Sequence, residues 1–307
     1  MDDRAERTYD CIAVGEALVD LISTQYANSL EQVSSFDMHP GGSPANLGGN
    51  LARLGRKVKF VGSIGNDGAG QLIQASLSST GLELSDLRKD SRPSSLILVT
   101  KSHDLPAFTA YREADAQILP SQFPAHQINK ARLFHTTAFG LSREPARGAI
   151  MNAARQVVSN GVQLSIDVNY AIEIWPDREE AQRVLTEYIE MGALVKMSEV
   201  DYERLFKAPI GDPSKVGQQI LSMGAGLLCL TLGKEGAYLF SEDQTIFMPS
   251  RPIEVVDTTG AGDAFWAGFL HGWLSGYGLE KCGLSGRQLA EMKLTHLGPL
   301  PRTVELD

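Results

Sequence analysis

Residues 257–270 read DTTGAGDAFWAGFL, a glycine-rich turn that runs directly into an apolar stretch. Gly260, Ala261 and Gly262 leave their backbone N–H groups open to an anion at the positive end of a helix dipole. Asp263 repels such an anion, so its position is best explained if it accepts a proton from the group that attacks the anion. The apolar residues predict a buried helix that keeps the turn rigid. A plain carboxylate at a helix start is the alternative that the segment alone leaves open.

The composition of the 307-residue chain is that of an ordinary globular protein, with 43% hydrophobic and 21% charged residues. The net charge of −9 argues against non-specific nucleic-acid binding, which needs a basic surface. Cys11, Cys229 and Cys282 are scattered without metal-ligand spacing, as expected of reduced thiols. No apolar run approaches the roughly 20 residues of a membrane span, and no signal peptide is evident. We therefore expect a cytoplasmic protein without membrane or nucleic-acid partners.

Short β-rich runs alternate with amphipathic helical stretches along the whole chain, which predicts one α/β domain over residues 1–307. We expect strands at 10–15, 57–65, 131–137, 162–168, 193–198, 226–233, 236–240 and 245–249, and helices at 44–55, 70–81, 145–161, 178–192 and 213–224. The alternation indicates a mostly parallel sheet with helices on both faces.

Three strands interrupt this alternation and predict a second, smaller sheet. VDLIS (19–23) follows the first strand without a helix, and SLILVT (95–100) and FTAYR (108–112) are joined by a short polar link. Strands joined in this way pair antiparallel. We expect lid strands within about 16–40 and 94–116 that cover the site. Exposed edges at VDLIS and FTAYR would suit a homodimer formed through the lid.

GGSPANLGGNLARLG (41–55) carries a second helix-start pattern. Ser43 is predicted to cap the helix, and Pro44 suits its first position. Gly41 and Gly42 allow close backbone approach, and Asn46 offers a donor and an acceptor to a ligand. A simple loop-to-helix junction remains the alternative.

Two other glycine-rich segments are less specific. The glycines of GSIGNDGAG (62–70) lack G-x-G-x-x-G spacing, so a nicotinamide site is not expected there. TLGKEGAYLF (231–240) reads equally as a hairpin and as a flat edge for a nucleotide.

Together, the 41–55 and 257–270 segments resemble the two signatures of the ribokinase-like (PfkB) family of sugar and nucleoside kinases. GEALVD (15–20), YREADA (111–116), DVNY (167–170), KMSEVD (196–201) and TLGKEGA (231–237) fall in the family's order, so the resemblance covers nearly the whole chain. The residues of these motifs are most similar to those of bacterial fructokinases. The resemblance implies a three-layer α/β/α core with a small β-sheet lid, and ATP-dependent transfer of the γ-phosphoryl group to a sugar hydroxyl.

The resemblance also implies roles for individual residues, together with ATP, Mg²⁺ and K⁺ as cofactors. Asp263 is the implied base, and the N–H groups of residues 260–263 form the anion hole. The implied sugar-binding residues are Asp20, Gly41, Gly42, Asn46, Phe108, Arg112 and Asn169. Ser198, Thr231, Gly233 and Gly236 match nucleotide-binding positions, Asp201 a magnesium-linked position, and Asp257 and Thr259 a monovalent-cation site. Strand alternation places Phe108 and Arg112 on the face that would cover the sugar, with Arg112 near the phosphate path.

Two positions depart from the family pattern. Ala171 stands where fructokinases usually have arginine after DVNY, which disfavours an acidic sugar. Arg287 stands about where an asparagine near the nucleotide base is usual, which leaves the adenine pocket open to question. We expect a fructokinase-like enzyme. A 2-keto-3-deoxygluconate or ribose kinase, and a catalytically weak binding homologue, are the alternatives.

Overall fold

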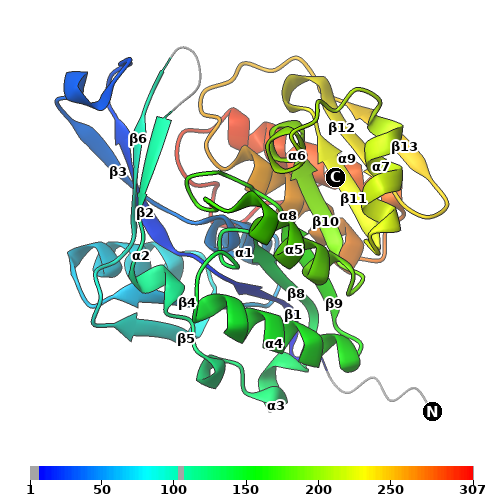
Figure 1. The fold of residues 1–307 in the computed structure, drawn as a ribbon, viewed down its shortest axis with the longest axis horizontal. Coiled ribbons are helices and arrows are strands. Elements are labelled where there is room, and N and C mark those ends of the chain that lie inside the picture. The colour runs from blue at the N-terminus through cyan, green and yellow to red at the C-terminus, as the bar shows by residue number, and fades with distance from the viewer. Residues whose placement is uncertain (1–6, 103–106, 307) are drawn as a thin grey trace.

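A mixed nine-stranded sheet forms the centre of the part of the chain that the computed structural model describes, residues 7–102 and 107–306 (Figure 1). Its order is β13-β12-β11-β10-β9-β8-β1-β4-β5; β12 pairs antiparallel with both β11 and β13, and all other neighbours pair parallel. The strands are β1 Tyr9–Val14, β4 Val58–Gly65, β5 Glu83–Asp90, β8 Ala131–Thr137, β9 Gln163–Asp167, β10 Leu194–Ser198, β11 Leu227–Thr231, β12 Gly236–Phe240 and β13 Thr245–Pro249. The predicted parallel sheet is confirmed, and TLGKEGAYLF forms the β11–β12 hairpin.

Helices cover both faces of this sheet, which confirms the three-layer core. One face carries α1 Ser43–Arg53, α2 Gly68–Ser78, α8 Ala261–Leu274 and α9 Leu279–Leu294, and the other carries α3 Ala125–Ile128, α4 Ala146–Ser159, α5 Arg178–Ile189, α6 Glu199–Phe206 and α7 Pro213–Ser222. Strand alternation feeds both cores: in β1, Ile12 and Val14 enter one core, and Cys11 and Ala13 enter the other.

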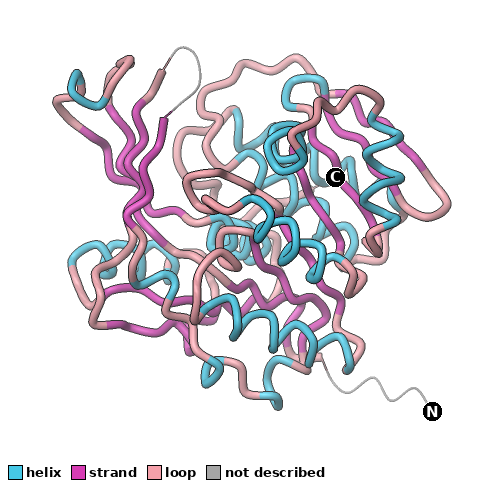
Figure 2. The backbone as a smooth tube through the Cα atoms, viewed as in Figure 1, coloured by secondary structure: helices cyan, strands magenta, loops and turns pink. Residues whose placement is uncertain are grey.

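The smaller sheet stands at one end of the body (Figure 2). Its order is β3-β2-β6-β7, from β2 Leu18–Ser23, β3 Phe36–Gly41, β6 Leu96–Thr100 and β7 Ala107–Tyr111. The β6–β7 pairing is antiparallel as predicted. VDLIS was wrongly predicted to be an edge, because β2 lies between β3 and β6 and the edges are β3 and β7. β3 and β5 are edge strands, and they were missed because neither contains a β-branched residue, the type that most favours a strand.

The apolar helix predicted after Asp263 is confirmed as α8, and small residues let α9 pack closely against it. A Cβ at Gly268 would lie 2.4 Å from the Ser285 carbonyl oxygen, and one at Gly286 would lie 2.8 Å from that of Phe265. Trp266 is buried and donates from its indole nitrogen to Ser165 on β9, at 3.0 Å. These contacts fix the N-terminus of α8 relative to the carboxyl ends of the central strands.

Candidate active site

The two helix starts singled out in the sequence meet at Asp263. The Ser43 hydroxyl donates to Asp263 Oδ1 at 2.7 Å, and the Asn46 amide donates to Asp263 Oδ2 at 2.9 Å. Ser43 does not cap α1 as predicted; Gly42 is the N-cap residue, which leaves the serine hydroxyl for Asp263. Both carboxylate oxygens are therefore oriented by α1, 217 and 220 residues away in the sequence.

The turn before α8 has the geometry of an anion-binding loop. Gly260 is in the left-handed region, with φ of 73°, and serves as the N-cap of α8. The N–H groups of Gly262 and Asp263 belong to the first helical turn, where no intrahelical acceptor exists for them. The Ala261 N–H donates to the Thr258 carbonyl at 3.2 Å. An incoming anion therefore meets the start of α8 beside Asp263.

A buried lysine lies directly beneath this turn. A Cβ at Gly262 would lie 3.1 Å from Lys196 Nζ, which also pairs with Asp167 at 2.9 Å. Burial disfavours the Lys196 ammonium, but the charges of Asp167, Asp201 and Asp263 outweigh it and raise the lysine pKa. The fixed positive charge of Lys196 therefore lies against the turn. No role was predicted for Lys196, because KMSEVD was identified only as a motif that resembles the family.

Asp20 lies near Asp263 on the side of the turn where the resemblance implies the sugar, which is called the acceptor side below. Burial, followed by the charge of Asp263, raises the pKa of Asp20 to about 7. A Cβ at Gly41 would lie 2.3 Å from Asp20 Oδ2, so a glycine is needed to admit the carboxylate. At Gly42, φ is 111° and a Cβ would lie 2.3 Å from the Glu16 carbonyl oxygen. The backbone therefore approaches closely at Gly42, whereas at Gly41 the close neighbour is the side chain of Asp20.

Glu16 supports this arrangement and was also missed. Its buried carboxylate accepts from the Ser43 backbone N–H at 3.1 Å and from the Thr137 hydroxyl at 2.8 Å. Burial raises its pKa to about 8, although the Thr137 hydrogen bond opposes the shift. Glu16 therefore ties the start of α1 to the end of β8. The signal available in the sequence was the position of Glu16 within the GEALVD motif.

Asp263 itself is half-buried, and burial raises its pKa above the ordinary value. The hydrogen bonds from Ser43 and Asn46 and the charge of Lys196 oppose this shift. A carboxylate with a raised pKa and a fixed orientation is suited to accept a proton.

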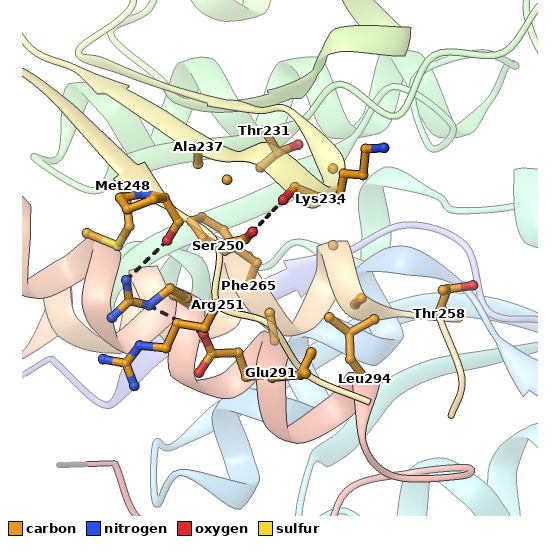
Figure 3. Close-up of a pocket in the computed structure, with 18 of the residues that line it drawn as sticks. Thr231, Lys234, Ala237, Met248, Ser250, Arg251, Thr258, Phe265, Glu291 and Leu294 are labelled. Atoms are coloured by element: carbon orange, nitrogen blue, oxygen red, sulfur yellow. Dashed lines mark hydrogen bonds and ion pairs between the residues drawn. The ribbon is translucent and has the colours of Figure 1, made fainter. Parts of the chain in front are cut away.

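A cleft of about 800 Å³ opens on the other side of the turn (Figure 3). Its walls include the predicted nucleotide residues Ser198, Thr231, Gly233 and Gly236, together with Thr258, Ala261 and Gly262 from the anion-binding turn. The far end is lined by Met248, Phe265, Arg287 and Glu291. Arg287 donates to the Pro249 carbonyl at 3.2 Å and pairs with Glu291 at 3.5 Å. The cleft therefore joins an end lined by apolar and charged side chains to the turn before α8.

Asp201 is buried beside Ser198, a residue of the cleft wall, and both of its carboxylate oxygens accept hydrogen bonds. It accepts from the Tyr170 N–H at 2.8 Å, the Ser198 N–H at 2.8 Å and the Ser198 hydroxyl at 2.6 Å. Within the described ranges no group of three or more His, Cys, Asp or Glu side chains could hold a metal ion. Glu199 also lines the cleft.

Three predicted sugar-binding residues, Phe108, Arg112 and Asn169, are not hydrogen-bonded to Asp263, whose side chain accepts from Ser43 and Asn46. Arg112 is buried behind the strand end of β7, where it pairs with Asp115 at 2.5 Å and stacks 3.9 Å from the Phe139 ring centroid. Phe108 on β7 is half-buried against the core. Asn169 is exposed after β9, with a positive φ of 33°, a conformation uncommon outside glycine. Asp257 and Thr259 adjoin the turn, and the Thr259 N–H donates to Asp257 at 2.9 Å.

A carboxylate oriented beside a glycine-rich helix start, with a second carboxylate nearby and a cleft of about 800 Å³, is the arrangement expected of a small-molecule phosphotransferase. The family model "pfkB family carbohydrate kinase" matches residues 9–303, and the chain belongs to this family. It is an enzyme of the carbohydrate kinase class. The family membership that the sequence resemblance implied is therefore confirmed.

Relatives and solved structures agree with this membership. The chain is 34% identical over 302 residues to an ATP-dependent 6-phosphofructokinase of Thermoanaerobacterium thermosaccharolyticum, covering 98% of this chain and 93% of the relative. The fructokinase structure of Halothermothrix orenii is 32% identical with a TM-score of 0.81, covering 91% of this chain and 98% of that one. The sugar kinase PH1459 of Pyrococcus horikoshii, solved with ATP, is 27% identical with a TM-score of 0.82, covering 94% and 93%. Kinases of this family use ATP. No helix within 7–102 and 107–306 has the length and apolar character needed to cross a bilayer.

Proposed function

We propose that this sugar kinase transfers the γ-phosphoryl group of ATP to a hydroxyl of a neutral sugar, with fructose as the preferred acceptor. The observation that carries this proposal is the position of Asp263, which Ser43 and Asn46 orient beside the anion-binding turn. Asp263 takes the hydroxyl proton as the sugar oxygen bonds to the γ-phosphorus, and the bond to the ADP oxygen breaks. The N–H groups of Gly262 and Asp263 stabilise the charge on the transferring group.

The charges around the acceptor side favour a neutral sugar. Asp20 and Asp263 accept hydrogen bonds from hydroxyl groups and repel a carboxylate or a phosphate. The nearby cations Lys196 and Arg112 are already paired with Asp167 and Asp115. Ala171 is buried and supplies no charge. This arrangement supports fructose over 2-keto-3-deoxygluconate. Ribose is also a neutral sugar, so the substrate panel described below is needed to distinguish it from fructose.

The nucleotide side follows from the cleft. Thr231, Gly233, Gly236 and Ser198 line the wall that would hold ATP, with its γ-phosphate at residues 260–263. Mg²⁺, when bound, neutralises developing phosphate charge, and Asp201 would act on it through water. The lid, with Phe108 on β7, would exclude water from the sugar. We also propose a cytoplasmic homodimer in which a lid edge, β3 or β7, pairs between subunits.

A substrate panel tests the proposal. Purified enzyme with ATP, Mg²⁺ and KCl is assayed for ADP release with fructose, ribose, 2-keto-3-deoxygluconate and fructose 6-phosphate. Fructose 6-phosphate is included because the 34% identical relative is named a 6-phosphofructokinase. The highest kcat/KM is expected with fructose. A higher kcat/KM with fructose 6-phosphate would show that the sugar phosphate, not fructose, is the preferred acceptor. Binding of ATP without turnover on any sugar would contradict the kinase mechanism.

A further inference from the structure

The last turn of α9 places a lysine against the anion-binding turn. Lys293 is buried, and its Nζ pairs with Asp257 Oδ2 at 2.9 Å and approaches the His296 carbonyl at 3.5 Å. The lysine stem adjoins Gly260, because a Cβ there would lie 3.9 Å from Lys293 Cε. A lysine this deeply buried is kept only when its charge is paired. Its position beside residue 260 therefore links α9 to the site.

The same position is where the family resemblance implies a monovalent cation. Asp257 and Thr259 are the implied ligands, but both carboxylate oxygens of Asp257 are already engaged: Oδ1 accepts the Thr259 N–H at 2.9 Å, and Oδ2 accepts from the Lys293 ammonium at 2.9 Å. A K⁺ ion needs oxygen ligands and would be repelled by the ammonium. The residues present do not fit K⁺.

We propose that the Lys293 ammonium occupies the place of the monovalent cation, so that the anion-binding turn is held in its working shape without K⁺. This inference rests on the proposed role of residues 260–263 as the anion-binding turn. An ammonium group carries the charge of K⁺ and is close to it in size. Because it is covalently attached to α9, it is present at every ionic composition of the medium.

Backbone contacts show how the lysine acts on the turn. The N–H groups of Val256 and Asp257 donate to the Leu294 carbonyl at 2.8 and 3.2 Å. The segment that leads into the turn is therefore pinned to the end of α9 by two backbone bonds and by the Lys293–Asp257 pair. Lys293 is a positioning residue in this account, since it reaches the phosphate site only through Asp257 and Gly260.

Thermal unfolding in matched salts tests this inference without requiring turnover. The Tm of the wild-type enzyme is measured in KCl and in choline chloride at equal ionic strength, and no difference is expected. Lys293→Ala removes the charge and opens space, so its Tm should fall by about 5 °C in choline chloride and recover selectively in KCl. Lys293→Met removes the charge but fills the space, so its Tm should fall without recovery. Lys281→Ala removes an exposed lysine of the same helix and should behave as wild type.

Turnover provides an independent readout once a sugar substrate is identified. Wild-type kcat should be the same in the two salts, and kcat of Lys293→Ala should rise severalfold with K⁺. A wild-type Tm or kcat that K⁺ raises above its value in choline chloride would overturn the inference, as would a Lys293→Ala variant that is indifferent to K⁺. Failure of all sugars as substrates would affect the proposed function but not the unfolding result.

Discussion

The acceptor side and the nucleotide side of the site are built on different principles. On the acceptor side, Asp263 is held by two hydrogen bonds from α1, and Asp20 fits only because residue 41 has no side chain. On the nucleotide side, loops and the faces of α8 and α9 surround an open cleft whose exposed walls include Val255. Substitutions should therefore be costly on the acceptor side and better tolerated around the nucleotide.

The largest effect is expected from Asp263→Asn. The amide keeps the shape of the side chain but cannot accept the sugar proton, so kcat should fall by about 10³-fold, while ATP binding measured by calorimetry stays largely intact. Asp177→Asn, which alters the N-cap of α5 far from the site, serves as the matched control. A variant with near-normal kcat would show that Asp263 is not the base.

The next largest effect is expected from Asp20→Asn. Replacing an acceptor for two sugar hydroxyls should raise the sugar KM by about tenfold to hundredfold, with the KM for ATP unchanged. The control is Asp37→Asn on the neighbouring strand β3, where the side chain is exposed. An equal rise in both KM values would mean that Asp20 supports the whole site rather than the sugar alone.

The pH profile distinguishes the two acceptor-side carboxylates. Because the pKa of Asp20 is raised to about 7, the residue gains a proton as the pH falls below that value and loses an acceptor. The kcat/KM for sugar should therefore fall by about tenfold per pH unit on the acid side. Steady-state rates from pH 5.5 to 8.5 measure this. The acid limb should disappear in Asp20→Asn; if it stays unchanged, another group such as Asp263 sets it.

A smaller effect is expected from Gly260→Ala, which probes the turn that both sides share. A side chain in the left-handed region costs about 1–2 kcal/mol, and distortion of the anion-binding turn should lower kcat by about tenfold. Gly276→Ala is the matched control, because its φ of 77° imposes the same strain with open space around it. The two variants should lose similar stability in denaturant unfolding. Equal kcat values in both would contradict a role for the turn geometry.

The sequence predicted the parallel sheet, the lid pairing of β6 and β7 and the buried helix α8, because apolar periodicity and glycine spacing are local signals. It did not predict that Ser43 serves Asp263 instead of capping α1, since that contact joins residues 220 positions apart. The pairings of Arg112 with Asp115 and of Lys293 with Asp257 were equally invisible. Arg112 and Asp115 are only three positions apart, but their pairing depends on the fold burying both side chains, whereas Lys293 and Asp257 are 36 positions apart, a separation that carries no information on contact.

The smallest effect is expected from Arg287→Ala, at the end of the nucleotide cleft. Arg287 forms part of the wall through an exposed hydrogen bond to the Pro249 carbonyl and a long pair with Glu291 at 3.5 Å. An exposed hydrogen bond and a long ion pair contribute little, so the KM for ATP should rise only about threefold, with the sugar KM unchanged. Steady-state kinetics with both substrates varied measure this. A rise in the KM for ATP of Arg287→Ala that exceeds the rise in the sugar KM of Asp20→Asn would reverse the contrast between the two sides. The nucleotide would then depend on one residue as strictly as the sugar does.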